Sequence, residues 1–231
     1  MRFVLASASP ARLAVLRAAG IDPEVRVSGV DEDAITEGLP DASPDELVTA
    51  LARAKAEAVA ATFTDPATLT DPVDPGAAAA TVVVGCDSML AINGRTVGKP
   101  GTADTARSRW AEMSGGTGAL LTGHAVVLVR HGEVVGEAAD TRTTTVRFAA
   151  PDAAELDAYV ATGEPLAVAG AFTLDGVGGW FVEGVDGDPS SVIGISLPLT
   201  RRLLAGVGVA VHELWRPALR AADDTRTGDR A

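Results

Sequence analysis

The stretch Phe3-Val-Leu-Ala-Ser-Ala-Ser-Pro-Ala-Arg12 leads from a strand into a helix. Phe3 to Leu5 is a short apolar run of the kind found in buried strands. Ser9 is a favoured N-cap and Pro10 a favoured first helical residue, so the helix is predicted to begin at Pro10. Strand and helix signals alternate in the rest of the chain, and several strands are long and joined by tight turns. This pattern indicates an α/β fold with a mixed sheet.

The turn between this strand and helix can hold a phosphate group. The first amides of a helix lack intrahelical partners and carry partial positive charge, which suits an anion. The hydroxyls of Ser7 and Ser9 can donate hydrogen bonds, and Arg12 can add a forked, charged contact. An ordinary capped helix with solvent-facing serines is the plainer account, and the turn taken alone favours it.

The remaining elements are predicted from apolar runs, capping residues and turn residues. A capping box at Ser43–Glu46 starts a helix that runs to about residue 63, and Asn93-Gly94 forms a hairpin turn. Further strands are predicted over 24–28, 81–85, 120–129, 141–148 and 209–214, and further helices over 102–113, 152–162 and 198–206. Three Asp-Pro pairs predict a mobile surface loop over 64–80, and the charged tail 217–231 is predicted to be disordered, which leaves one domain over 1–216.

The overall charge narrows the class of ligand. The chain has 231 residues and a formal net charge of −12. Such a protein does not bind nucleic acid through a general basic surface. Positive charge for a phosphorylated ligand must therefore be placed locally, which directs attention to Arg12 and to the few lysines, Lys55 and Lys99.

The single cysteine, Cys86, allows no intrachain disulfide, which suits a reducing cytoplasm. The apolar run at the N-terminus is too short for a signal peptide, and no run of 18 apolar residues is present to span a membrane. One cysteine and three scattered histidines make no zinc signature. We expect a cytoplasmic protein without a membrane segment, in which Cys86 and His124 are packing residues.

Two carboxylates are predicted to lie where strands end. Glu32 belongs to an acidic loop over 30–33 that follows the second strand, and Asp87 comes two residues after the apolar strand over 81–85. Ligand crevices of α/β sheets lie at the carboxyl ends of strands, so the pair can hold Mg²⁺ with several waters. For Glu32 alone, a solvated acidic loop is the better account; for Asp87, a capping or turn role is an equal alternative.

The two lysines and a glycine-rich segment complete the candidate residues. Lys55 lies in the middle of an alanine-rich helix, where a solvent-facing side chain is the plain account. Lys99 is held between Gly98 and Pro100 in a rigid turn, which suits a phosphate contact but is also common without function. Glycines over 162–176 let the backbone approach either a ligand or another strand closely.

Nine blocks, in one order and spacing, resemble the Maf family of nucleotide pyrophosphatases. They cover almost everything from residue 3 to about 215. They are LASASPARLAVL (5–16), VDED (30–33), LARAKAEAVA (51–60), VVVGCDSML (82–90), VGKP (97–100), MSGGTGALLTGHAV (113–126), TTTVRF (143–148), YVATGEPLAVAGAFTLDG (159–176) and VDGDPSSVIGISLPL (185–199).

The resemblance implies an α/β fold shared with the inosine triphosphate pyrophosphatases, with an elongated mixed sheet, flanking helices and two lobes around a central cleft. It implies hydrolysis of a nucleoside triphosphate between its α and β phosphorus atoms, with Mg²⁺ or Mn²⁺ as the cation. It also implies a cytoplasmic protein that forms a homodimer. By position, the phosphate-binding residues are Ser7, Ser9 and Arg12, the charged cleft residues are Glu32, Lys55 and Lys99, and the catalytic base is Asp87; the metal ligands expected from the residues themselves remain Glu32 and Asp87.

Three positions depart from the common family patterns and bear on substrate choice. Ala11 stands where an arginine is usual, and Ser88 where the thymidine and uridine triphosphate branch has threonine. Asp175 resembles the acidic residue found near this position in the branch that acts on methylated guanosine triphosphate. An acid here is expected to accept hydrogen bonds from a nucleobase N–H, as guanine offers. The chain fits neither branch fully, so these positions do not identify the preferred nucleobase.

Two other functions compete with pyrophosphate release. The first is a non-enzymatic, nucleotide-binding regulator of septum formation, an older role attached to the family. The second is a phosphatase that removes only the γ phosphate. Retention of Asp87, Glu32 and both lysines favours the pyrophosphatase.

Overall fold

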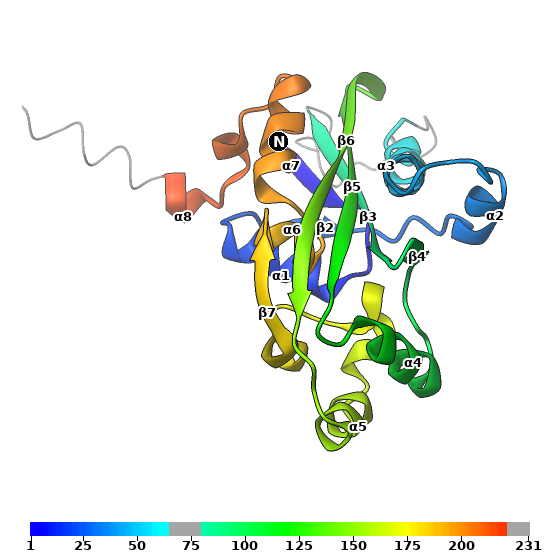
Figure 1. The fold of residues 1–231 in the computed structure, drawn as a ribbon. Coiled ribbons are helices and arrows are strands. Elements are labelled where there is room, and N and C mark those ends of the chain that lie inside the picture. The colour runs from blue at the N-terminus through cyan, green and yellow to red at the C-terminus, as the bar shows by residue number, and fades with distance from the viewer. Residues whose placement is uncertain (65–79, 221–231) are drawn as a thin grey trace, which may run out of the picture.

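The strand–helix turn at the N-terminus opens a mixed sheet that organises the molecule (Figure 1). A computed structural model describes residues 1–64 and 80–220. In these residues the sheet has seven strands in the order β2-β1-β3-β5-β6-β7, with β4 paired to β3. Both neighbours of β1 run parallel to it, and all other pairs are antiparallel. The strands are β1 (Arg2–Leu5), β2 (Glu24–Val25), β3 (Thr81–Ile92), β4 (Arg95–Val97), β5 (Thr117–Arg130), β6 (Glu133–Phe148) and β7 (Val182–Asp186).

Most of the predicted helix starts are found with their caps. Ser9 accepts a hydrogen bond from the amide of Arg12, and Ser43 and Glu46 form the predicted capping box. The α-helices are α1 (Pro10–Ala18), α2 (Glu32–Glu37), α3 (Pro44–Ala61), α4 (Ala103–Met113), α5 (Ala153–Ala161), α6 (Pro189–Ile193), α7 (Leu197–Gly206) and α8 (Pro217–Arg220). Short 3₁₀ helices are η1 (Glu164–Ala167), η2 (Ala169–Ala171), η3 (Val177–Phe181) and η4 (Val211–Leu214).

The core has two parts along the long strands. At one end, α3 covers one face of β1, β3 and β5, while α1 and α7 cover the other (Figure 1). Successive residues of β3 serve opposite faces there, since Val82 and Val84 pack toward α1 and α7 whereas Val83 packs toward α3. At the other end, α4 and α5 enclose a cluster around Trp110, which makes edge contacts with Phe148 and other rings. The expected α/β fold with two lobes is therefore confirmed.

Two glycines let α3 lie directly on the sheet. A Cβ added at Gly85 would come 2.3 Å from the carbonyl oxygen of Ala52, and one at Gly123 would come 2.2 Å from that of Val48. Gly85 lies on β3 two residues before Asp87, and Gly123 lies opposite Asp87 on β5. The close approach brings the middle of α3 next to Asp87.

The strand containing Asp87 is longer than predicted. The sequence places Asp87 two residues past a strand that ends at Gly85, but β3 continues to Ile92. Residues 86–91 stay in the sheet because each pairs with a residue of β5. The expectation that Asp87 lies past the end of its own strand was therefore wrong, but the neighbouring strand β1 ends at Leu5, opposite Val84. Asp87 thus lies just beyond the carboxyl end of β1.

Other predicted bounds were wrong in informative ways. The acidic loop over 30–33 is the start of α2, because the Asp31 side chain caps the helix by accepting from the amide of Ala34. The predicted strand over 209–214 contains η4 instead. The second strand is limited to Glu24–Val25, β5 is slightly longer than 120–129, and β6 ends at Phe148 as predicted but begins at Glu133 instead of 141.

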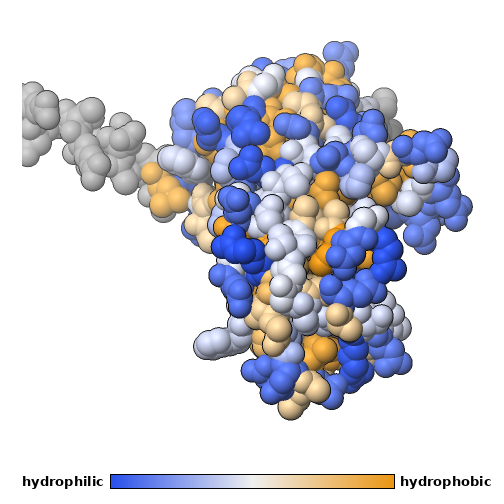
Figure 2. Space-filling model, in the orientation of Figure 1, coloured by the Kyte–Doolittle hydropathy of each residue, from blue (hydrophilic) through white to orange (hydrophobic). Residues whose placement is uncertain are grey.

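The predictions for 64–80 and 217–231 fall largely outside the described residues. Of the tail, the structure describes only residues 217–220, which form α8, and the expectation of disorder for the rest lies outside the described residues. No helix in the described ranges combines the length and apolarity needed to cross a bilayer. Hydrophilic and apolar side chains are interspersed over the face shown in Figure 2.

Candidate active site

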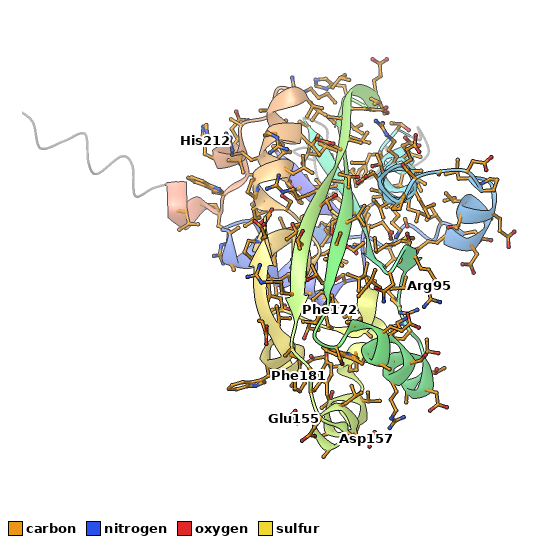
Figure 3. All side chains as sticks on the ribbon, viewed as in Figure 1. Arg95, Glu155, Asp157, Phe172, Phe181 and His212 are labelled. Atoms are coloured by element: carbon orange, nitrogen blue, oxygen red, sulfur yellow. The ribbon has the colours of Figure 1, made fainter. Side chains whose placement is uncertain are left out.

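A cleft of about 450 Å³ lies where the two parts of the core meet. This volume is within the range of small-molecule sites. The β1–α1 turn and β3 contribute to one side, and Phe172, which Figure 3 labels near the waist of the molecule, contributes to the other. All ten positions singled out in the sequence line this cleft: Ser7, Ser9, Ala11, Arg12, Glu32, Lys55, Asp87, Ser88, Lys99 and Asp175.

Three charged side chains form a compact group on the α3 side of the cleft. The Nζ atom of Lys55 lies 2.7 Å from Oδ1 of Asp87 and 2.8 Å from Oε1 of Glu32. The side chains of Lys55 and Asp87 are only 9% and 10% exposed, whereas that of Glu32 is 52% exposed. The plain account of Lys55 as a solvent-facing residue is therefore wrong. Buried charges of this kind are stable only when paired, and the lysine pairs with both acids.

Arg12 forms a second group on the opposite face of β3. Its Nη1 donates to Oγ of Ser7 at 2.9 Å, its Nη2 to Oγ of Ser88 at 3.2 Å, and its Nε to the carbonyl of Gly194 at 2.8 Å. Ser7 also accepts from the amide of Ser9 at 3.2 Å. Consecutive strand residues point to opposite faces, so Asp87 contacts Lys55 while Ser88 contacts Arg12. The guanidinium is thus fixed beside the first turn of α1.

The far wall is held by a carboxylate that the sequence analysis did not single out. Glu164 accepts hydrogen bonds from Oγ1 of Thr173 at 2.5 Å and from the amides of Val177 and Gly178 at 3.0 and 2.9 Å. Burial opposes the charge, but these hydrogen bonds outweigh it and lower the pKa of Glu164. The segment they hold carries Asp175 into the cleft. An acid inside the glycine-rich block was the signal that could have identified it.

Lys99 is exposed at the cleft, and its turn is held by Arg109, another residue that the sequence analysis missed. Arg109 donates to the carbonyl oxygens of Gly98 and Lys99. Burial lowers the pKa of Arg109 from its usual value. The turn that presents Lys99 is therefore tied to α4.

Cys86 and His124 are buried, as expected of packing residues. Burial raises the pKa of the Cys86 thiol to about 11, which keeps it protonated at neutral pH. His124 does more than pack. Its Nδ1 lies 2.9 Å from the carbonyl oxygen of Thr122, and its Nε2 accepts from the amide of Ser196 at 2.7 Å. It thereby links β5 to the start of α7.

The two acids in the cleft fit a cation that is coordinated partly by the protein and partly by substrate phosphates. No group of three or more potential metal-ligating side chains occurs in the residues that the structure covers. Glu32 and Asp87 supply two hard carboxylates, and Lys55 contacts one oxygen of each. Mg²⁺ usually binds through one or two carboxylates together with water and substrate phosphates, so this donor set is sufficient.

Comparison with known proteins identifies the family of the chain. The family profile described as Maf-like protein matches residues 2–207. The chain belongs to the Maf family. Similar Maf relatives carry the name nucleoside triphosphate pyrophosphatase. The protein from Saccharopolyspora erythraea is 66% identical over 94% of this chain and 98% of its own length. Those from Rhodococcus opacus and Mycobacterium ulcerans are 60% and 55% identical, over 92% and 93% of this chain and 95% and 96% of their own lengths.

Proposed function

We propose that this Maf family chain is a nucleoside triphosphate pyrophosphatase, which splits the α–β phosphoanhydride into a nucleoside monophosphate and pyrophosphate. The observation that carries the proposal is the gathering of Arg12, Lys55 and Lys99 with two carboxylates in one cleft of an acidic protein. A triphosphate carries about four negative charges, so such a protein needs local cations to bind it. The name of its relatives supports the same activity.

The phosphates would lie between the two charged groups. The partial positive charge at the start of α1 and the guanidinium of Arg12 would face one end of the chain of phosphates, and Lys99 would approach from its exposed turn. Ser7 accepts two hydrogen bonds from the protein, so its own proton can be donated to a phosphate oxygen. A divalent cation held by Glu32 and Asp87 would neutralise charge on the phosphate oxygens.

The chemical step would use Asp87 as the base. A water oxygen attacks the α phosphorus, the bond from that phosphorus to the α–β bridging oxygen breaks, and pyrophosphate leaves with that oxygen. The water gives its proton to Asp87, whose Oδ1 is held by Lys55 so that the carboxylate keeps its orientation. Lys55 therefore has two roles in this proposal, orienting the base and adding positive charge beside the phosphates.

The finer parts of the proposal concern the nucleobase that is recognised, the oligomeric state and the cellular compartment. Asp175 on the far wall would accept a hydrogen bond from a base N–H, as guanine offers, and Ala11 and Ser88 would contribute to the choice. Non-standard or modified nucleotides are the substrate class we favour. A cytoplasmic homodimer remains part of the proposal, on the strength of the family resemblance.

The test is a panel of standard and methylated nucleoside triphosphates with Mg²⁺, Mn²⁺ or a chelator, in which pyrophosphate and orthophosphate are measured separately. Pyrophosphate release that needs the cation supports the proposal. Tight nucleotide binding without turnover under any cation would favour the septum regulator. Orthophosphate without pyrophosphate would favour removal of the γ phosphate alone.

A further inference from the structure

Behind Ser88, outside the lining of the cleft, lies a fully buried threonine. Thr122 of β5 pairs in register with Ser88 of β3, and their hydroxyl oxygens are 3.0 Å apart. The same Thr122 hydroxyl lies 3.0 Å from the carbonyl oxygen of Ser191 in α6. Together with the contact from Arg12 to Ser88, these distances form a continuous row of polar groups from the cleft into the protein.

The direction of every hydrogen bond in this row is fixed by what each group can do. A carbonyl only accepts, so Thr122 must give its single hydroxyl proton to Ser191. Thr122 can then only accept from Ser88, which uses the proton of Ser88. A guanidinium only donates, so Ser88 accepts from Arg12. The relay therefore runs one way, from Arg12 through Ser88 and Thr122 to the backbone of Ser191.

This direction separates the two serines that touch Arg12. Ser7 accepts from Arg12 and from the amide of Ser9, which leaves its proton for a ligand. Ser88 has its proton committed to Thr122 and has none to give to a base or phosphate. Ser88 therefore does not donate to the nucleotide; it influences binding through Arg12, and its second lone pair can still accept from a nucleobase N–H.

Both ends of the relay lead to α6. Ser191 lies in α6, and the carbonyl of Gly194, the C-cap of α6, accepts directly from Nε of Arg12. The helix is itself held by Asp188, whose carboxylate accepts from the amide and hydroxyl of Ser190 and from the hydroxyl of Ser196. Two of the three hydrogen bonds of the Arg12 side chain therefore fix the guanidinium plane relative to α6, one directly and one through Ser88 and Thr122.

We propose that Thr122 is a positioning residue for Arg12: its buried hydroxyl orients Ser88, and through Ser88 it sets the guanidinium plane that receives the phosphates. The inference rests on the proposed function, in which Arg12 binds the triphosphate. Its energetic basis is that an arginine already held in its bound orientation loses less conformational freedom when the ligand arrives.

The experiment compares Thr122→Val, which keeps the side-chain volume but removes the hydroxyl, with Thr122→Ser, which keeps the hydroxyl. Inorganic triphosphate with Mg²⁺ is the probe in calorimetry, because it carries the phosphates without an unknown base. Thr122→Val is expected to weaken its affinity about fivefold to tenfold, the loss of one relay hydrogen bond. With the best nucleotide of the panel, KM should rise by a similar factor while kcat changes less than twofold, and Thr122→Ser should stay within about twofold of wild type.

A double-mutant cycle separates positioning from general damage. In the Arg12→Ala background, Thr122→Val should have no further effect on affinity, because the group that it positions is gone. Thr200→Val is the matched control, a buried threonine on α7 whose hydroxyl has no partner in the described residues, and it should leave affinity unchanged.

The outcomes distinguish the positioning role of Thr122 from the proposed function. Wild-type affinity in Thr122→Val, or effects of Arg12→Ala and Thr122→Val that simply add, would overturn the positioning role while leaving the proposed function intact. Wild-type protein that neither binds triphosphate nor releases pyrophosphate would overturn both.

Discussion

Asp87 and Ser88 are neighbours in β3, yet their side chains leave the strand on opposite faces and meet different cations. Asp87 contacts Lys55 from α3, whereas Ser88 contacts Arg12 from α1. Because side chains alternate between the two faces of a strand, two adjacent residues place a carboxylate and an arginine-binding hydroxyl in one cleft. A single substitution at either position therefore removes the contact with one of the two basic side chains and leaves the other in place.

Replacing Asp87 by Asn should abolish turnover while the fold survives. The amide keeps the shape of the side chain but cannot take the proton of the attacking water, so kcat should fall at least about a hundredfold. Nucleotide affinity should change far less, because Arg12 and Lys99 remain. Pyrophosphate release measures the loss of turnover, and thermal unfolding shows whether the fold survives.

The matched control for this substitution is Asp157→Asn, which removes an exposed carboxylate on α5 that pairs with Arg107 (Figure 3). It should leave both kcat and stability near wild type, since exposed ion pairs contribute little. If Asp87→Asn keeps most of the wild-type activity, Asp87 is neither the base nor an essential metal ligand.

A second prediction at this scale concerns stability alone. The buried hydroxyl of Thr200 has no hydrogen-bond partner among the described residues. Valine has the same shape without the polar atom, and both residues are β-branched, so helix propensity changes little. Thr200→Val should raise the free energy of unfolding by about 1 kcal/mol, as measured by urea denaturation. A destabilised variant would contradict the assignment of Thr200 as unsatisfied.

Residue types in the cleft could be predicted from the sequence, but their contacts could not. Composition drew attention to Lys55 and Lys99 because lysine is rare in the chain and the net charge is −12. The burial of Lys55 depends on Gly85 and Gly123, which are distant in sequence and allow α3 to approach the sheet. The contact between Lys55 and Asp87 is a consequence of that packing, so no local pattern near Lys55 reveals it.

At the scale of elements, the seat of α3 on the sheet decides where Lys55 lies. Gly123→Ala would place a methyl group within 2.2 Å of the carbonyl oxygen of Val48, so the helix must move away. We expect a loss of stability of about 2 kcal/mol or more, together with reduced kcat, because Lys55 moves relative to Asp87. Urea denaturation and pyrophosphate release test the two parts.

Gly206→Ala is the matched control for this packing effect. A Cβ added there meets only that of Ala138, at 3.9 Å, which is an ordinary contact. Since Gly206 ends α7, alanine should leave stability equal or slightly higher. Equal effects of the two glycine substitutions would show that close packing of α3 is not what distinguishes Gly123.

Sequence patterns predicted helix starts and turns well, because caps and turns depend on residues that are close together in the chain. The caps at Ser9 and Ser43, and the turn at Asn93-Gly94 with both residues at positive φ, are all present. The extension of β3 through Asp87 was missed because polar residues interrupt its apolar run. Pairing with β5 keeps that segment in the sheet, and a partner strand cannot be read from β3 alone.

For the molecule as a whole, composition and alternation indicated a mixed α/β sheet but not the strand order. The order places β1 next to β3, which are separated by about 75 residues of chain. Family resemblance supplied the two lobes and the cleft between them. Physical reasoning from the sequence could not, because the cleft exists only where β1 ends and β3 continues into the second lobe.

Stability of the whole molecule should depend on pH through His124. The histidine donates from Nδ1 to Thr122 and accepts at Nε2 from Ser196, an arrangement that requires the neutral ring. Burial, reinforced by the charge of Arg12, lowers its pKa to about 4 from 6.5, against weaker opposing effects of the Thr122 carbonyl and of Asp188 and Asp140.

The sign of this effect follows from which state takes up a proton first. Above pH 6.5 the ring is neutral in both states and its contribution is complete. As the pH falls from about 6.5 toward 4, the unfolded chain is protonated and the folded protein is not, so stability decreases by about 1.4 kcal/mol per pH unit, to a total of about 3 kcal/mol. His124→Gln removes this titration, so its stability, although lower at pH 7, should fall less steeply from pH 6.5 to 5. Urea denaturation of both proteins across that range tests this, and parallel curves would show that His124 is not buried in its neutral form.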